Sequence, residues 1–284
     1  TYQLIDNIFK TLRNCFTSSF VNIGMDEAHM LGLGKYLDKY GYQKRFDILF
    51  RHLNKVVEIA KKYNFKPIMW SDMFFRLANQ GEYYASTSDL PVEIRSCVPE
   101  DIQLAYWDYY KTDIEQYRQM LDFHKKFDNE IWFAGGAWSW KGFASGNWHS
   151  LRTMKPAMQA CRERGINNVI ITLWGDNGKE CSFYALLPAL FAIRKFYDGE
   201  NDLDEIKKEF FEITGEKFDY LCALDNPDKV NGFDEINTIS KTMFYSDPFN
   251  GYFDALIDLK YDYKKEYLKL AQYFKTCTIN SKYS

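Results

Sequence analysis

The chain has 284 residues, 46% of them hydrophobic and 26% charged, so it is long enough to bury a core as one large or two smaller domains. Its 36 basic and 39 acidic residues are mixed along the sequence and leave a net charge of −3, which gives no electrostatic signature of nucleic acid or membrane-surface binding. The longest apolar stretches fall well short of the roughly 20 residues that a membrane-spanning helix needs. We therefore expect neither nucleic acid nor a membrane as a partner.

The N-terminal twenty residues have a helical pattern and no initiating methionine, so we expect no signal peptide and a chain that begins partway through a protein. The six cysteines are far apart and lack CxxC spacing, which favours reduced thiols over a zinc site or a disulfide scaffold and leans toward a cytoplasmic compartment. The four histidines are equally scattered, and we expect no metal or other cofactor. The cysteines are Cys15, Cys97, Cys161, Cys181, Cys222 and Cys277.

Five short apolar runs alternate with helical patterns along the first two thirds of the chain, which is typical of βα units in a parallel sheet. The predicted strands are residues 21–26, 66–71, 102–108, 130–137 and 167–175. Predicted helices cover residues 43–63 and 113–127, and a third ends at Arg164-Gly165. Only helical patterns follow, at residues 183–197, 202–214 and 262–276. We therefore expect an α/β region over residues 1–197 and an all-helical region over 198–284.

The first predicted strand stops on two adjacent carboxylates, Asp26 and Glu27. Acids at the end of a buried strand are costly to place, so this pair is the first candidate for function. Neighbouring residues of a strand point to opposite faces, and the two carboxylates are therefore expected to have different roles rather than to flank one bond.

The other predicted strands end on tryptophans and acids. In a parallel α/β fold the carboxyl ends of the strands carry the active site. Aromatic rings suit the C–H face of a sugar and carboxylates accept hydrogen bonds from its hydroxyls, so the pattern predicts a carbohydrate site. The ends are Trp70-Ser71-Asp72, Trp107-Asp108-Tyr109, Trp138-Ser139-Trp140 and Trp174-Gly175-Asp176.

In these features residues 1–197 resemble glycoside hydrolase family 20, the β-N-acetylhexosaminidases. That family has an Asp-Glu pair after strand 4 of a (β/α)8 TIM barrel, tryptophans after later strands and a Trp-x-acid after strand 8. The matching residues here are Asp26-Glu27, Trp70, Trp107 and Trp174-Gly175-Asp176. The resemblance implies that the chain carries about strands 4 to 8 and lacks strands 1 to 3. Such a chain alone would expose half a barrel core and lack activity.

The resemblance also implies a retaining, substrate-assisted mechanism on terminal β-linked N-acetylhexosamine, with a carbohydrate as the partner. The acetamido oxygen of the sugar attacks C1, Glu27 serves as general acid and then base, and Asp26 stabilises the acetamido N–H. The tryptophans wall the acetamido pocket and the sugar face, and Asp176 binds hydroxyls. The implied wall residues are Trp70, Trp107, Trp138 or Trp140, and Trp174.

The sequence departs from the family pattern at several positions. Asn22 stands where family members commonly have His, Met25 where they have Gly, and Asp176 where they have Glu. The tyrosine that binds the acetamido carbonyl is also absent from its usual strand. Tyr109 is the replacement candidate, with Tyr110 next.

Two alternatives stay open from the sequence. One is a retaining glycosidase in which Asp72, Asp108 or Asp176 is a covalent nucleophile and Glu27 the acid. The other is a non-catalytic carbohydrate-binding protein. Asp72 and Asp108 also have a plain structural interpretation, as caps of the loops that follow them.

Overall fold

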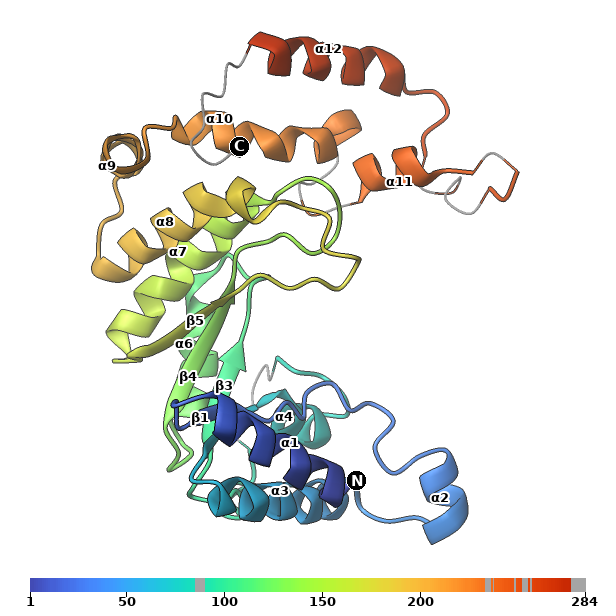
Figure 1. Ribbon diagram of the computed structural model, residues 1–284, viewed down its shortest axis with the longest axis vertical. Helices are drawn as coiled ribbons and strands as arrows, with labels where there is room; N and C mark the ends of the chain where they lie inside the picture. The colour runs from blue at the N-terminus through green and yellow to red at the C-terminus, as the bar shows by residue number, and fades with distance from the viewer. Residues whose placement is uncertain are drawn as a thin grey trace. The chain divides into compact units, whose positions relative to one another are not determined.

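The computed structural model describes residues 1–84, 90–232, 236, 238–247, 249–251, 255 and 257–276 (Figure 1). The chain forms two compact units. The first unit comprises Thr1–Trp107, Glu115–Ala134 and Arg164–Ile170, and the second comprises Asp108–Ile114, Gly135–Glu163 and Ile171–Ser284. A domain boundary between residues 197 and 198 stays a prediction.

The five predicted strands are present and form one sheet in the order β1-β2-β3-β4-β5. Pairing is parallel from β1 to β4, as the alternation of strands and helices predicts. This α/β arrangement is consistent with part of a TIM barrel. The strands are β1 (Phe20–Asn22), β2 (Lys66–Trp70), β3 (Gln103–Trp107), β4 (Ile131–Gly136) and β5 (Asn168–Thr172).

In the first unit α1 precedes β1, and the other helices connect β1 to β2, β2 to β3 and β3 to β4. The predicted helices at 43–63 and 113–127 correspond to α3 and α6, whereas the helical pattern of the first twenty residues yields a helix that ends at Cys15. The helices are α1 (Tyr2–Cys15), α2 (Lys35–Tyr40), α3 (Arg45–Lys62), α4 (Asp72–Ala78), α5 (Val92–Arg95) and α6 (Ile114–His124).

Helix α1 packs against α3 in the first unit (Figure 1). Phe9 of α1 and Val56 and Ala60 of α3 form one buried cluster with Phe65, which directly precedes β2. Asn64, two residues after the end of α3, has a φ of 57° and is in the left-handed conformation. The chain thereby turns from the helix into β2 within four residues.

Among its described residues, the regular elements of the second unit are helices, except for the last residues of β4 and β5. Helices α7 and α8 pack side by side (Figure 1). The single helix predicted over 183–197 is a 3-10 helix followed by α8, because Pro188 favours the first turn of a new helix. The elements are α7 (Asn147–Glu163), η1 (Phe183–Leu186), α8 (Leu187–Asp198), α9 (Leu203–Thr214), α10 (Phe218–Cys222), η2 (Ala223–Asp228), η3 (Val230–Gly232), α11 (Ile239–Tyr245) and α12 (Tyr263–Thr276).

Among the described residues, no helix is both long and apolar enough to cross a membrane. The five described cysteines are free thiols, and Cys161, Cys181 and Cys222 are buried. Cys277 lies outside the described residues, as does part of the long connection between Leu77 and Asp101.

A fully buried histidine stabilises the core of the first unit. His124 at the end of α6 donates from Nδ1 to the Met120 carbonyl at 2.6 Å, and its Nε2 lies 2.7 Å from the Ser71 hydroxyl. The imidazole also packs on the rings of Phe75 and Tyr106, at 4.6 and 4.9 Å between centroids. Burial lowers the pKa of His124 from 6.5 to about 4, so the neutral ring is the folded form.

We expect this histidine to give the first unit a specific pH dependence. The pKa of His124 is lower in the folded protein than in the unfolded chain, so protonation favours unfolding. The stabilisation by neutral His124 is complete above pH 6.5 and is lost as the pH falls toward 4, where the loss reaches about 3 kcal/mol. Urea unfolding at pH 7 and pH 5 should show a larger loss of stability in the wild type than in His124→Gln. Carboxyl titrations are common to both proteins and cancel in this comparison. Equal losses would contradict the prediction.

Candidate functional site

Asp26 and Glu27 lie on a loop of the first unit and not on a strand. Strand β1 ends at Asn22, and Gly24, Met25 and Glu27 have φ values of 71°, 72° and 47°. These left-handed conformations end the strand four residues before the expected position. The prediction of a strand to Asp26 is therefore wrong, and so is the alternation argument built on it. Both acids are exposed and not buried.

Two backbone contacts fix this acid loop, residues 23–28, against β2. The N–H of Ile23 donates to the Ile68 carbonyl at 2.8 Å, and the Trp70 N–H donates to the Gly24 carbonyl at 3.2 Å. The loop begins with an Asx-type turn in which Asn22 Oδ1 accepts from the Gly24 N–H at 2.8 Å. Asn22 at this position therefore has a structural role in the turn.

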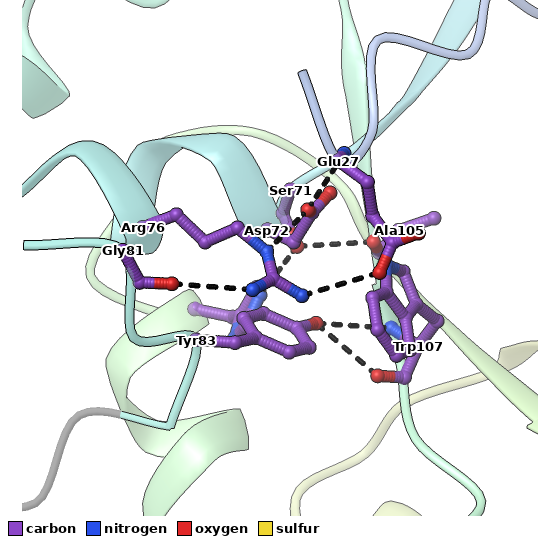
Figure 2. A network of polar contacts seen from close by, with 9 residues as sticks. Glu27, Ser71, Asp72, Arg76, Gly81, Tyr83, Ala105 and Trp107 are labelled. Carbon is purple, nitrogen blue, oxygen red and sulfur yellow. Dashed lines mark hydrogen bonds and ion pairs between the residues drawn. The ribbon is translucent and has the colours of Figure 1, made fainter. Parts of the chain in front are cut away.

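The buried carboxylate of Asp72 connects the acid loop to α4 (Figure 2). Asp72 Oδ2 accepts from the Glu27 N–H at 3.0 Å and from Arg76 Nε at 2.9 Å. Burial raises the pKa of Asp72, while these two hydrogen bonds act in the opposite sense. Asp72 thus has a structural task in this loop.

Arg76 is a site residue that the sequence did not reveal. Its Nη2 lies 3.4 Å from Glu27 Oε1, and its Nη1 donates to the Gly81 carbonyl at 3.2 Å. The guanidinium also lies over the ring of Tyr83, 5.4 Å from its centroid. A spacing of four residues from Asp72 on a short helix was the available signal, because it allows an ion pair on one helix face.

Trp70 and Trp107, which the sequence predicted as walls of the site, both belong to the first unit and are each 9% exposed. The Tyr83 hydroxyl contacts the backbone of Trp107, donating to its carbonyl at 3.2 Å and accepting from its N–H at 3.3 Å (Figure 2). The rings of Tyr83 and Trp107 are 4.7 Å apart. The network around Glu27 therefore continues to the end of β3.

The other predicted site residues belong to the second unit, which groups their aromatic rings. Trp140 lies 4.1 Å from Trp138 and 5.0 Å from Tyr109, measured between ring centroids. All three side chains are buried. Gly136 permits this packing, because a Cβ there would lie 3.0 Å from both Trp140 and Tyr109.

The phenol of Tyr109 stays protonated over a wide pH range. Burial raises its pKa strongly, and Tyr110 and Asp176 add to that effect, whereas Trp174 acts against it. Trp174 is partly exposed and Asp176 is exposed. A buried neutral phenol is a hydrogen-bond donor for a carbonyl.

Asp108 has a structural contact of its own. Its side chain is fully buried, and Oδ1 accepts from the Tyr110 N–H at 2.9 Å. This is the loop-capping interpretation that the sequence left open.

Helix α7 carries a histidine that supports Tyr109. His149 Nε2 lies 2.9 Å from the Tyr109 carbonyl, and its ring packs 4.8 Å from that of Trp138. The start of α7 is in turn held by the buried Asp225, which accepts from the Trp148 N–H at 3.0 Å and from Asn147 at 3.0 Å. Burial raises the pKa of Asp225, and these hydrogen bonds offset part of that effect.

No group of three or more His, Cys, Asp and Glu side chains is placed to hold a metal ion in the described part of the chain. The two groups present carboxylates, a guanidinium, a phenol and aromatic faces.

A scan against protein-family models and a search of curated proteins found no match. Among solved structures, the chain is similar to a glycoside hydrolase family 20 exo-β-N-acetylglucosaminidase from Vibrio harveyi in complex with N-acetylglucosamine. That structure has 13% identity and a TM-score of 0.48, and the match covers 79% of this chain and 35% of that one. An inactive mutant of the enzyme matches with 13% identity, a TM-score of 0.46 and the same coverage. The chain spans about a third of the length of these enzymes, and the likeness is a distant one of fold.

We expect Asp225→Ala to destabilise the second unit by about 3 kcal/mol, because it leaves buried donors of Asn147 and Trp148 without their acceptor. Urea unfolding followed by near-ultraviolet circular dichroism would measure this loss. The matched control is Asp219→Ala, which removes an exposed ion pair with Lys207 and should cost less than about 1 kcal/mol. Equal effects of the two substitutions would show that Asp225 does not hold α7.

Proposed function

We propose that the protein is a β-N-acetylhexosaminidase that removes terminal β-linked N-acetylhexosamine residues with retention of configuration. The observation that carries this proposal is the presentation of Glu27: an exposed carboxylate on a loop held by Asp72 and Arg76, with Asp26 beside it in the sequence. Exposure lets Glu27 reach a sugar, and the fixed loop limits its orientations.

In the proposed reaction the acetamido oxygen of the substrate attacks C1 and forms a cyclic oxazoline-type intermediate. Glu27 donates its proton to the departing glycosidic oxygen as the C1–O bond breaks. Asp26 accepts a hydrogen bond from the acetamido N–H while positive charge develops there. Glu27, now a carboxylate, then takes a proton from the water that attacks C1 and opens the ring.

The aromatic residues are proposed to bind the sugar. Tyr109 donates a hydrogen bond from its phenolic O–H to the acetamido carbonyl oxygen, and its raised pKa keeps that O–H protonated. Asp176 accepts from sugar hydroxyls, which its exposure permits. The proposed walls of the site are Trp70, Trp107, Trp138, Trp140 and Trp174.

Two of the three candidate protein nucleophiles, Asp72 and Asp108, are buried and already engaged, which favours the acetamido group over them, whereas the third, Asp176, is exposed. Asp72 is fully buried and accepts from Glu27 and Arg76, and Asp108 is fully buried and accepts from Tyr110. A nucleophile has to reach the anomeric carbon with a free oxygen. The assignment of the strands as 4 to 8 of a barrel belongs to the same proposal.

In the intact gene product, Glu27→Gln should lower kcat on aryl N-acetyl-β-glucosaminides by about 10²- to 10⁴-fold, because the amide cannot donate and recover the proton. Initial rates and equilibrium binding of N-acetylglucosamine would be measured together, and binding should survive. The control is Glu58→Gln, an exposed acid of α3 in the same unit. Full activity of Glu27→Gln would overturn the assignment of the acid.

The acetamido group should be required for turnover. We expect hydrolysis of the N-acetylglucosaminide but not of the matching glucoside, and strong inhibition by a thiazoline analogue of the cyclic intermediate. Equal rates on both sugars would point to a protein nucleophile. Sugar binding without turnover of either would point to a carbohydrate-binding protein.

Tyr109→Phe should lower kcat about 10- to 100-fold, because one hydrogen bond to the reacting carbonyl is lost. Tyr110→Phe is the matched comparison, since its side chain is 45% exposed and the sequence left it as the second candidate. A loss in Tyr110→Phe with full activity of Tyr109→Phe would exchange the two roles. Steady-state kinetics of both variants decide between them.

A further inference from the structure

The backbone of Glu27 is held in a conformation that a residue with a side chain rarely adopts. Its φ of 47° lies in the left-handed region, which is uncommon for residues other than Gly, Asn and Asp. The N–H of Glu27 points to the buried Asp72 Oδ2 at 3.0 Å. Such conformations persist where surrounding contacts over-determine them, and they concentrate at functional sites. Asp72 supplies such a contact from α4.

The side chain of Glu27 is held from the same helix. Arg76 is only 16% exposed, and its guanidinium is fixed by Asp72, by the Gly81 carbonyl and by the ring of Tyr83. This fixed group also reaches an exposed side chain, with Nη2 at 3.4 Å from Glu27 Oε1 (Figure 2). A planar guanidinium held in this way is pre-organised for a carboxylate.

We propose that Asp72 and Arg76 are the positioning residues of Glu27: Asp72 fixes its backbone and Arg76 orients its carboxylate. This inference rests on the proposed function, in which Glu27 is the general acid and base. When Glu27 gives its proton to the departing oxygen, a negative charge forms beside the Arg76 guanidinium, which stabilises it without rearrangement. The contribution of Arg76 is therefore largest where proton donation is rate-limiting.

Leaving groups of different basicity test Arg76. Arg76→Gln should lower kcat about 10- to 100-fold on an N-acetylglucosaminide with a poor leaving group, which needs the proton. On the 2,4-dinitrophenyl substrate, which needs little protonation, the loss should be less than about threefold. Arg76→Lys should restore part of the rate on the poor leaving group. A merely structural role would lower both rates equally, and that result overturns the proposal.

The control for Arg76 is Arg164→Gln. Arg164 also belongs to the first unit, is 25% exposed and pairs with Asp122 at 3.0 Å. The Arg164→Gln substitution should leave unchanged the ratio of the rates on the poor-leaving-group and the 2,4-dinitrophenyl substrates. A change of that ratio in Arg164→Gln would show that general loss of stability, and not the contact with Glu27, produces the effect.

Amide hydrogen exchange tests Asp72 without any need for turnover. Asp72→Asn weakens the acceptor for the Glu27 N–H, so exchange of that amide should become about tenfold faster. Asp122→Asn should leave it unchanged. Unaltered exchange in Asp72→Asn would overturn the role of Asp72.

These results separate the inference from the function on which it rests. An intact wild-type gene product that turns over neither substrate contradicts the proposed function, while the exchange rate still decides whether Asp72 holds Glu27. An active wild type whose Arg76→Gln variant loses the two rates equally contradicts the inference and leaves the proposed function standing.

Discussion

The buried carboxylate of Asp72 is the constraint on which the arrangement around Glu27 depends. A carboxylate excluded from water needs hydrogen-bond donors, and Asp72 Oδ2 finds them in the Glu27 N–H and Arg76 Nε. The two hydrogen bonds to this one oxygen therefore fix an exposed loop, a helix and an arginine relative to one another. Glu27 remains in contact with solvent, yet it has a defined backbone and a defined neighbour. That combination suits a group that must both hold and exchange a proton.

The second unit uses buried aspartates in a related way. Asp225 and Asp228 belong to the short helix η2, and both are almost completely excluded from solvent. Asp225 accepts from the first turn of α7, and Asp228 accepts from the Ser240 N–H of α11 at 2.9 Å. Carboxylates at helix N-termini satisfy otherwise unpaired N–H groups and interact favourably with the helix dipole. A segment of six residues thus orients two helices, one of which carries the support for Tyr109.

The strand prediction succeeded where the signal was local. Strands β2 to β5 lie within the predicted ranges, because buried parallel strands are continuous apolar runs bounded by turn residues. It failed at the end of β1, where Gly24 and Met25 take left-handed conformations that interrupt an apolar pattern. Gly24 indicated from the sequence that a positive φ was available there, whereas methionine rarely adopts a positive φ and Met25 gave no such signal. Both acids consequently lie in solvent, on a loop and not on a strand.

The sequence by itself determined the alternation of strands and helices, since local hydrophobic periodicity indicates each element. It also determined which acids and aromatic residues follow the strands, since these are neighbours in the chain. It did not determine the partners of Glu27. Asp72 and Arg76 lie 45 and 49 residues further along the chain, and only the parallel pairing of β1 with β2 brings α4 to the acid loop. Contacts between residues so far apart in the sequence depend on the register of the strand pairing and on which side chains are excluded from water. Those are properties of the folded chain, and only the tertiary structure decided them.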